Sequence, residues 1–371
     1  MHFEYNEDQI AIRDSMQKYL LENYDFEQRQ AYVNADESFN QSVWAQYAEL
    51  GWTYLPFEES LGGFGGSPVD TMLLFEEFGK HLIVEPYLET IMLAAKTLEK
   101  SDCAKKSEIL EAVMAGNKQL AFAHYEGAHR GKLDNVAATA SASGEAIVLN
   151  GHKSFVINAD VADYFVVSAQ AQGVLSLFLV PADAGGINLS TYATKHGKVA
   201  AELVLKDVEL GVESKIAEGD RALALLNDVV DEATVALIAE MVGAMEVLIS
   251  ATVEYSKDRE QFGTPIGKFQ VLQHMMADMF MAKELSRSLM YAAAIKLRDK
   301  TGDASKFVSA AKAKADNCAR QVAHAAVQIH GGIGTTDELK ISHYLKRILV
   351  NRDLLGSTDY HLQRFKDYNQ A

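Results

Sequence analysis

The sequence predicts an α+β fold, mostly α-helical, in which a β-domain lies between two helical regions. Apolar residues recur every three or four positions over residues 6–115 and again after Glu218, but every second position over residues 118–207. The 371-residue chain is 48% hydrophobic with only five prolines, which suits a helix-rich globular protein with a large core. We therefore expect three domains: an N-terminal helical domain at 1–117, a middle β-domain at 118–215 and a C-terminal four-helix bundle at 216–371.

The N-terminal region is predicted to be a set of amphipathic helices that a glycine-rich segment interrupts. The segment is Gly62-Gly63-Phe64-Gly65-Gly66, and the following Ser67-Pro68-Val69-Asp70 has the pattern of a helix N-terminus. A phosphate-binding loop is the alternative interpretation. Because no strand is predicted before these glycines and no Lys-Ser/Thr follows them, we interpret them as a loop between helices.

The middle region is predicted to contain about eight strands, and the C-terminal region a bundle. The alternating apolar runs include residues 146–149, 164–168, 175–180 and 201–205, and Gly, Asn and Asp punctuate them. After Glu218 we expect long helices over about 221–257, 269–298 and 304–329, and two shorter helices between 338 and about 367. Three long helices and a shorter fourth would form an antiparallel bundle.

The composition limits the classes of partner and compartment. A formal net charge of −16 argues against nucleic acid or an anionic membrane surface. Cys103 and Cys318 lie in unrelated segments without metal-ligand spacing, so we interpret them as reduced thiols and expect no metal site. Residues 1–8 have no leader pattern, and the chain has no run of eighteen apolar residues. We therefore expect a soluble, cytoplasmic protein.

Two glycine-containing motifs about seventy residues apart are the strongest functional signal. In the first, from Arg259 to Gln270, we expect a helix to end at Gly263, a turn to pass through Pro265 and Gly267, and a helix to start near Phe269. This break would place a guanidinium, an aromatic ring and backbone amides at one corner.

The second motif closes an alanine-rich helix with three glycines, in the sequence Gln328-Ile329-His330-Gly331-Gly332-Ile333-Gly334. Glycines allow the backbone to approach a flat or phosphorylated ligand closely. His330 could be considered as an acid or a metal ligand, but we interpret a lone histidine without ligand spacing as a packing or backbone-bonded residue.

Together, in this order and separation, the two motifs resemble those of the acyl-CoA dehydrogenase flavoprotein family, and the resemblance covers nearly the whole chain. It implies a middle domain that is a β-barrel, FAD as cofactor, an acyl-CoA as substrate and electron-transfer flavoprotein as electron acceptor. It also implies a homodimer or homotetramer, with FAD lying across a subunit interface.

The same resemblance implies which residues bind FAD. Arg259 would pair with the diphosphate of one FAD, while Gln328 and the glycines after it would belong to the neighbouring subunit. In the β-domain, Phe155 would stack on the flavin. The full set of implied cofactor-binding residues is Arg259, Gln261, Phe262, Gly263, Phe269, Gln270, Gln328, Ile329, Gly331, Gly332, Phe155, Asn158 and Glu126.

The β-domain departs from the family pattern at two places. Residues 122–130 stand where the family has a Thr-Glu-Pro-Gly-Ala-Gly-Ser-Asp-like loop, and only Glu126 and a glycine match it. Ile157 stands where the family has a threonine whose hydroxyl bonds the flavin N5.

The catalytic base of the family is also replaced. A glutamate is expected twenty-seven residues after Gln328, and that position is Leu355. A minority of the family has the base on the first bundle helix, at the position of Ala233. Its neighbour Glu232 would serve as the base only if the local register or the start of that helix differed, because adjacent residues on a helix point in different directions. Glu240 lies two turns farther along an apolar stretch, so we expect it to be either buried with a partner or functional.

This combination resembles the small-subunit branch of the family, such as the pimeloyl-CoA dehydrogenase small subunit. In that branch a paralogous subunit would supply the base within a heterotetramer. FAD-dependent α,β-dehydrogenation of an acyl-CoA is therefore the leading hypothesis. A non-catalytic flavin-binding or structural subunit is the second, and a flavin monooxygenase on the same fold is the third.

Overall fold

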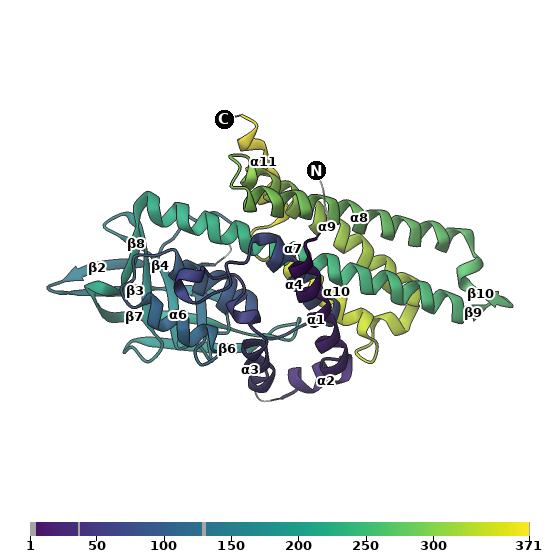
Figure 1. The fold of residues 1–371 in the computed structure, drawn as a ribbon, viewed down its shortest axis with the longest axis horizontal. Coiled ribbons are helices and arrows are strands. Elements are labelled where there is room, and N and C mark those ends of the chain that lie inside the picture. Colours follow the sequence, from purple (N-terminus) through teal and green to yellow (C-terminus); the bar gives the residue numbers. More distant parts are fainter. Residues whose placement is uncertain (1–4, 36–37, 128–130, 371) are drawn as a thin grey trace. The chain divides into compact units, whose positions relative to one another are not determined.

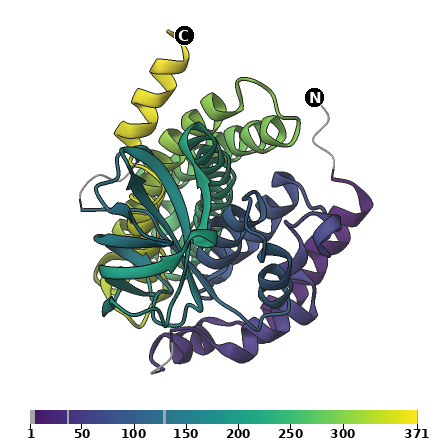
Figure 2. The same ribbon diagram turned by 90° about the vertical axis from the view of Figure 1, so that its left-hand side faces the viewer.

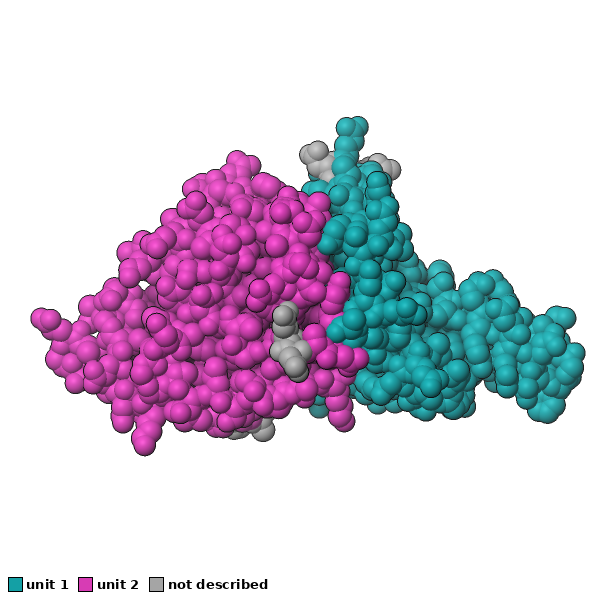
Figure 3. All heavy atoms as spheres, turned by 90° about the horizontal axis from the view of Figure 1, so that it is seen from below, with its two compact units in different colours: residues 1–31, 67–83, 234–371 teal, residues 32–66, 84–233 magenta. Residues whose placement is uncertain are grey.

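The computed structural model describes residues 5–35, 38–127 and 131–370, which fold into two compact units (Figure 3). Unit 1 comprises Met1–Ala31, Ser67–Ile83 and Thr234–Ala371, and unit 2 comprises Tyr32–Gly66 and Val84–Ala233. Unit 1 is mostly helical, whereas unit 2 contains the β-domain together with some of the helices that precede it (Figure 1). The α+β class with helical ends and a middle β-domain is therefore confirmed. The three domain boundaries stay a prediction.

Unit 1 contains the predicted bundle. Its helices are α1 (Glu7–Asn23), most of α2 (Phe26–Val33), α4 (Pro68–His81), the second part of α7 (Gly219–Asp258), α8 (Gln270–Arg298), α9 (Ala304–His330), α10 (Lys340–Asn351) and α11 (Thr358–Tyr368), with 3-10 turns η5 (Ile266–Lys268) and η6 (Gly331–Thr335). Helix α9 packs against α8, α10 and α11. The helices predicted after Glu218 are thus confirmed to within two residues at most ends.

Two glycines allow helices α4 and α7 to cross at backbone contact. A Cβ added to Gly79 on α4 would lie 1.9 Å from the carbonyl oxygen of Glu240 on α7. A Cβ on Gly243 would lie 2.0 Å from the carbonyl oxygen of Glu76. Since real side chains do not approach so closely, only glycine fits at both positions.

The start of α4 follows the sequence prediction. Ser67 caps the helix: its hydroxyl accepts from the Val69 amide, and the Ser67 amide donates to the Asp70 carboxylate at 2.7 Å. Pro68 occupies the first turn, where its missing N–H costs nothing. The glycine-rich segment before it connects η2 (Glu59–Leu61) to α4 as a loop, as predicted.

Unit 2 is built around one eight-stranded sheet (Figure 2). Its strands are β1 (Leu120–Ala123), β2 (Thr139–Ser143), β3 (Ala146–Ile157), β4 (Tyr164–Ala171), β5 (Val174–Pro181), β6 (Ile187–Ala193), β7 (Val199–Gly211) and β8 (Lys215–Glu218). The order is β6-β7-β3-β2-β4-β5-β8, and β1 pairs with β4 in parallel. Strands β6 and β8 are the two edges of this sheet, and no pairing between them is seen among the described residues. The resemblance implied a β-barrel, and the structure shows, in the described part of the chain, a β-sheet domain whose hydrogen-bonded ring is not closed.

The remaining elements of unit 2 are helical. They are α3 (Gln41–Glu49), η1 (Trp52–Tyr54), η2, η3 (Tyr87–Ala95), α5 (Lys96–Glu99), α6 (Lys106–Met114), η4 (Val212–Ser214) and the first part of α7. Element η3 is a nine-residue π-helix that contacts β1, and such helices are rare. Its Glu89 forms a buried ion pair with Lys198 at 2.8 Å.

Helix α7 is the one helix in the described part of the chain that is long and apolar enough to cross a membrane. However, 78% of its most apolar eighteen-residue stretch is buried inside the protein. Its apolar length is therefore that of a core helix.

Candidate functional site

The first motif forms a hairpin, which corrects the predicted helix end. Helix α7 stops at Asp258, five residues before Gly263, and strands β9 (Glu260–Gln261) and β10 (Thr264–Pro265) pair antiparallel after it. The two residues between the strands, Phe262 and Gly263, have φ values of 57° and 78°. Two positive φ values identify a type I′ turn, which suits the twist of a two-residue hairpin.

The hairpin presents its functional side chains to solvent. Arg259, Gln261 and Gln270 are exposed, and the Phe262 side chain is 95% exposed. The Phe269 ring lies 6.2 Å from the Phe262 ring in a T-shaped arrangement. Two neighbouring aromatic rings at the surface offer apolar area that a ligand or another subunit could cover.

The second motif ends α9 as predicted. Gly331 has φ 68° and ψ −146°, a conformation that glycine tolerates and other residues rarely adopt. A Cβ added to Gly331, Gly332 or Gly263 would meet no atom within 4 Å. Gln328 is exposed, whereas Ile329 is buried. Three glycines with open space beside them and an exposed guanidinium suit a diphosphate, so the residues of unit 1 fit the FAD that the resemblance implies.

Unit 1 brings the two motifs to the same end of the bundle. Tyr255, one helical turn before Arg259, stacks on His330 with ring centroids 4.4 Å apart. The Tyr255 hydroxyl donates to the His330 carbonyl at 3.3 Å, and His330 Nδ1 lies 2.8 Å from the Ala326 carbonyl. Burial lowers the pKa of His330. His330 is thus a packing and backbone-bonded residue, which is the interpretation that the sequence favoured.

The candidate residues of unit 2 are held by polar contacts within that unit. Glu126 Oε1 accepts from the Lys153 ammonium at 2.5 Å and from the Ala138 amide at 3.0 Å, and Oε2 accepts from the Ala137 amide at 2.5 Å. Burial raises the pKa of Glu126, but Lys153 and these amides outweigh it, so the net pKa is lowered and the group is a carboxylate. Glu126 therefore links its loop to Lys153 and to the backbone of residues 137–138. The rest of that loop, residues 128–130, lies outside the described residues.

Lys153 is a residue that the sequence analysis did not single out. It is fully buried and also approaches the His124 carbonyl at 3.3 Å and the Ser168 hydroxyl at 3.1 Å. Burial lowers the pKa of Lys153 to about 8, although Glu126 opposes the change. Its position on a strand between polar residues gives no sequence signal of burial.

Phe155 and Asn158 both have positive φ, of 54° and 64°. Phe155 lies at an irregularity of the β3–β7 pairing, and its amide donates weakly to Glu202 at 3.4 Å. The Asn158 side chain points inward and donates to Thr90 Oγ1 at 3.0 Å. The Phe155 ring is half-buried. The flavin-stacking role of Phe155 and the cofactor role of Asn158 stay predictions.

None of the positions considered for the base carries an uncommitted carboxylate. Leu355 and Ala233 are buried and apolar. Glu232 accepts from Lys100 at 2.9 Å, and this carboxylate with that of Asp228 raises the pKa of Lys100 against the effect of burial.

Glu240 is buried in unit 1 and paired. Its Oε1 accepts from Arg347 Nε at 2.5 Å and from Asn351 Nδ2 at 2.7 Å, both on α10. The Arg347 guanidinium also donates to the Ile83 carbonyl at 3.0 Å. This geometry favours the structural alternative for Glu240. Its catalytic role, like that of Glu232, stays a prediction.

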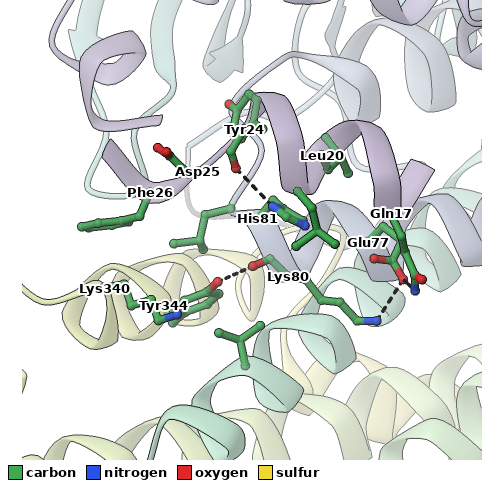
Figure 4. Close-up of a pocket in the computed structure, with 13 residues that line it drawn as sticks. Gln17, Leu20, Tyr24, Asp25, Phe26, Glu77, Lys80, His81, Lys340 and Tyr344 are labelled. Carbon is green, nitrogen blue, oxygen red and sulfur yellow. Dashed lines mark hydrogen bonds and ion pairs between the residues drawn. The ribbon is translucent and has the colours of Figure 1, made fainter. Parts of the chain in front are cut away.

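Unit 1 also contains a cavity of about 440 Å³ between α1, α4 and α10 (Figure 4). Leu20, Tyr24 and Tyr344 form apolar walls, and Lys80 at its edge pairs with Glu77 at 2.9 Å. His81 Nδ1 lies 3.1 Å from the Tyr24 carbonyl. The described residues that line the cavity include none of the predicted site residues.

Comparison with known proteins identifies relatives along most of the chain. Models of the acyl-CoA dehydrogenase N-terminal, middle and C-terminal domains match residues 6–117, 121–208 and 224–367. The probable acyl-CoA dehydrogenase YngJ of Bacillus subtilis is 26% identical over 358 residues, which are 93% of each chain. The caffeyl-CoA reductase-Etf complex subunit CarC of Acetobacterium woodii is 28% identical over 320 residues, 83% of this chain and 84% of that protein.

Solved structures agree with these relatives. PigA with FAD and proline superposes with a TM-score of 0.92 at 25% identity, covering 100% of this chain and 99% of that chain. A variant of the Tcur3481-Tcur3483 steroid ACAD has a TM-score of 0.88 at 28% identity, covering 97% of both chains. Butyryl-CoA dehydrogenase of Megasphaera elsdenii, at 24% identity and a TM-score of 0.91, shows the same fold.

The cofactor prediction is confirmed, because the chain matches the acyl-CoA dehydrogenase domain models and its structural relative PigA has been solved with FAD. The three matched models follow one another from residue 6 to residue 367 with short gaps between them. The chain therefore belongs to the acyl-CoA dehydrogenase family.

Proposed function

We propose that this chain binds FAD and acts in the α,β-dehydrogenation of an acyl-CoA thioester as the small subunit of a heteromeric enzyme. The observation that carries the proposal is the buried Leu355 at the position where the family has its glutamate base. The two nearby alternatives are engaged, Glu232 by Lys100 and Glu240 by Arg347 and Asn351. A carboxylate that removes the α-proton must be held in an apolar pocket and be able to accept that proton. In this proposal a paralogous subunit supplies it.

The residues of unit 1 would hold the cofactor. FAD, when bound, accepts the hydride from the acyl β-carbon. Arg259 would neutralise the diphosphate, and the backbone at Gly331 and Gly332 would approach it without a Cβ in the way. Phe262 and Phe269 would cover the adenosine side.

Exposed apolar side chains support association with another subunit. Val271, Phe280, Met281 and Leu285 on α8 are each more than half exposed, and so is Phe262 of the hairpin. The relatives supply two further hints. CarC is named as a subunit of a caffeyl-CoA reductase-Etf complex. The name of the steroid ACAD, Tcur3481-Tcur3483, joins two proteins. They support a heterotetramer with a paralogue and electron-transfer flavoprotein as acceptor, although a homodimer or homotetramer would use the same surface.

A non-catalytic subunit that binds flavin only to stabilise an active paralogue is the second candidate. The leucine at position 355, where the family has its glutamate base, favours this second function as well. The two functions differ in whether the flavin of this chain is reduced by acyl-CoA within the assembled enzyme.

The flavin site is tested with Arg259→Ala. Because the guanidinium would pair with the diphosphate, the variant should lose bound flavin by at least about tenfold in affinity while remaining folded. The measurement is the flavin-to-protein ratio after gel filtration, with circular dichroism as the folding check. Arg298→Ala, at the exposed end of α8, is the matched control and should retain flavin. A full flavin spectrum in Arg259→Ala would show that the assigned site is wrong.

A further inference from the structure

The turn between α10 and α11 has an unusual backbone for its sequence. Leu355 has φ 58° although it carries a branched side chain, and Gly356 has φ 106°. A residue other than glycine in this region is uncommon, and it persists where the surrounding structure imposes the conformation. The turn also contains the position of the missing base, so what holds its backbone determines how the side chain at 355 is presented.

A buried lysine holds two carbonyls of this turn. Lys312 on α9 is fully buried, and its ammonium donates to the Arg352 carbonyl at 3.1 Å and to the Gly356 carbonyl at 3.4 Å. Its third acceptor is Asp316 Oδ1, one helical turn along α9, at 2.7 Å. An ammonium has three N–H donors, and here three oxygens receive them.

A histidine holds the carbonyl between those two. His361 on α11 is buried, and its Nε2 lies 3.0 Å from the Leu355 carbonyl while Nδ1 lies 3.4 Å from the Ser309 hydroxyl. Burial lowers the pKa of His361 to about 3, so the ring is neutral at physiological pH. A carbonyl only accepts, and therefore Nε2 carries the proton and Nδ1 accepts from Ser309.

Two further residues of the turn, Gly356 and Thr358, lie close to Asp316 and His361. Thr358 donates to Asp316 Oδ2 at 3.1 Å, which ties the start of α11 to the anchor of the lysine. A Cβ at Gly356 would lie 2.5 Å from the Tyr360 ring and 2.9 Å from His361 Nε2, so only glycine fits there.

Stability alone does not account for a fully buried ion pair. Replacing such a pair by apolar residues of similar volume is often neutral or stabilising, because desolvation opposes the attraction. A pair that binds particular backbone carbonyls instead specifies a conformation. In sequence, a lysine and an aspartate four residues apart on an alanine-rich helix were the only signal of it.

We propose that Lys312 is a positioning residue of the active-site turn: anchored by Asp316 and assisted by His361, it fixes the carbonyls of residues 352, 355 and 356 and so sets the orientation of the side chain at 355. The role of the turn in an acyl-CoA site rests on the proposed function. In this chain the side chain that these contacts orient is a leucine.

The proposal that Lys312 fixes the backbone of the turn is tested by amide hydrogen exchange of the full chain with bound FAD. In Lys312→Met the peptide covering residues 352–358 should exchange about tenfold faster than in the wild type, while peptides of α8 stay unchanged. Lys314→Met, an exposed lysine on the same helix, is the matched control and should not change exchange. Thr358→Val, which removes only the bond to Asp316, should give a smaller increase and serves if Lys312→Met does not fold. Unchanged protection of residues 352–358 in Lys312→Met, or in Thr358→Val if that variant has to serve, would overturn the proposal.

The role of Lys312 in catalysis is tested in the background of Leu355→Glu, which places a carboxylate in the turn. If it confers dehydrogenation, adding Lys312→Met should lower kcat about tenfold or more with KM within about twofold, because orientation matters in the transition state. Equal kcat in the presence and absence of Lys312 would overturn the positioning role. An inactive Leu355→Glu enzyme with faster exchange in Lys312→Met would contradict the proposed function of the turn and leave the structural role of Lys312 supported.

Discussion

At the scale of single residues, the site shows which inferences a sequence permits. The exposed Arg259 and the open glycines at 331 and 332 could be predicted because local motifs specify them. The partner of Glu240 could not, because Arg347 lies on a helix more than a hundred residues later. Sequence reasoning left Glu240 as either buried with a partner or functional, and only the tertiary fold supplies the partner.

Glu240→Ala should lower the free energy of unfolding by about 3–5 kcal/mol, because it removes the buried carboxylate that accepts from Arg347 and Asn351. Urea unfolding monitored by circular dichroism measures the change. Glu254→Ala, which removes an exposed carboxylate paired with Lys257, is the control and should change stability by less than about 0.5 kcal/mol.

Glu240→Gln separates the structural role from a catalytic one, since the amide oxygen can still accept from Arg347 and Asn351. Reduction of the flavin by acyl-CoA in the assembled enzyme should be unaffected. Complete loss of reduction in a folded, flavin-loaded Glu240→Gln variant would instead identify Glu240 as the base.

At the scale of elements, helices and strands followed from periodicity, but two features did not. The hairpin after α7 has Phe262-Gly263 at its turn, whereas the usual sequence signal of a type I′ turn is Asn-Gly or Asp-Gly. The glycine motif therefore predicted a helix end at Gly263, whereas the apolar periodicity predicted the end near residue 257, where the structure has it. The π-helix η3 also escaped prediction, because its apolar sequence suits an ordinary α-helix equally well.

The crossing of α4 and α7 gives the element-scale prediction. Gly79→Ala and Gly243→Ala should each destabilise the protein by about 3 kcal/mol, because the new Cβ would meet a carbonyl oxygen on the other helix and force the helices apart. Gly302→Ala is the control, since a Cβ there meets no atom within 4 Å. Thermal unfolding of the three variants provides the comparison. Equal melting temperatures would show that the helices cross less closely.

At the scale of the whole molecule, buried neutral histidines make stability depend on pH. Burial, aided by the nearby ammonium groups of Lys153 and Lys312, lowers the pKa of His124 and His361 to about 3. An unfolded histidine has a pKa of about 6.5. Between these values the unfolded chain binds more protons than the folded chain, so the free energy of unfolding falls as pH falls through the window.

The expected slope approaches about 1.4 kcal/mol per pH unit for each histidine between pH 6 and 4. Urea unfolding at several pH values measures it. His124→Gln should reduce the slope, and His274→Gln, on the exposed face of α8, is the matched control. An unchanged slope in His124→Gln would contradict a neutral, buried His124.

We infer that this family member binds FAD but lacks its own catalytic base. The direct test is anaerobic bleaching of the bound flavin in the isolated chain by short-, medium- and long-chain acyl-CoAs, dicarboxylyl-CoAs and ring-bearing acyl-CoAs. We expect the wild type to bleach about 10² to 10⁴ times more slowly than Leu355→Glu with the preferred acyl group, since that range is the usual contribution of a general base. Rapid bleaching of the wild type by an ordinary straight-chain acyl-CoA would contradict the account and direct attention to Glu232 or Glu240 as a relocated base.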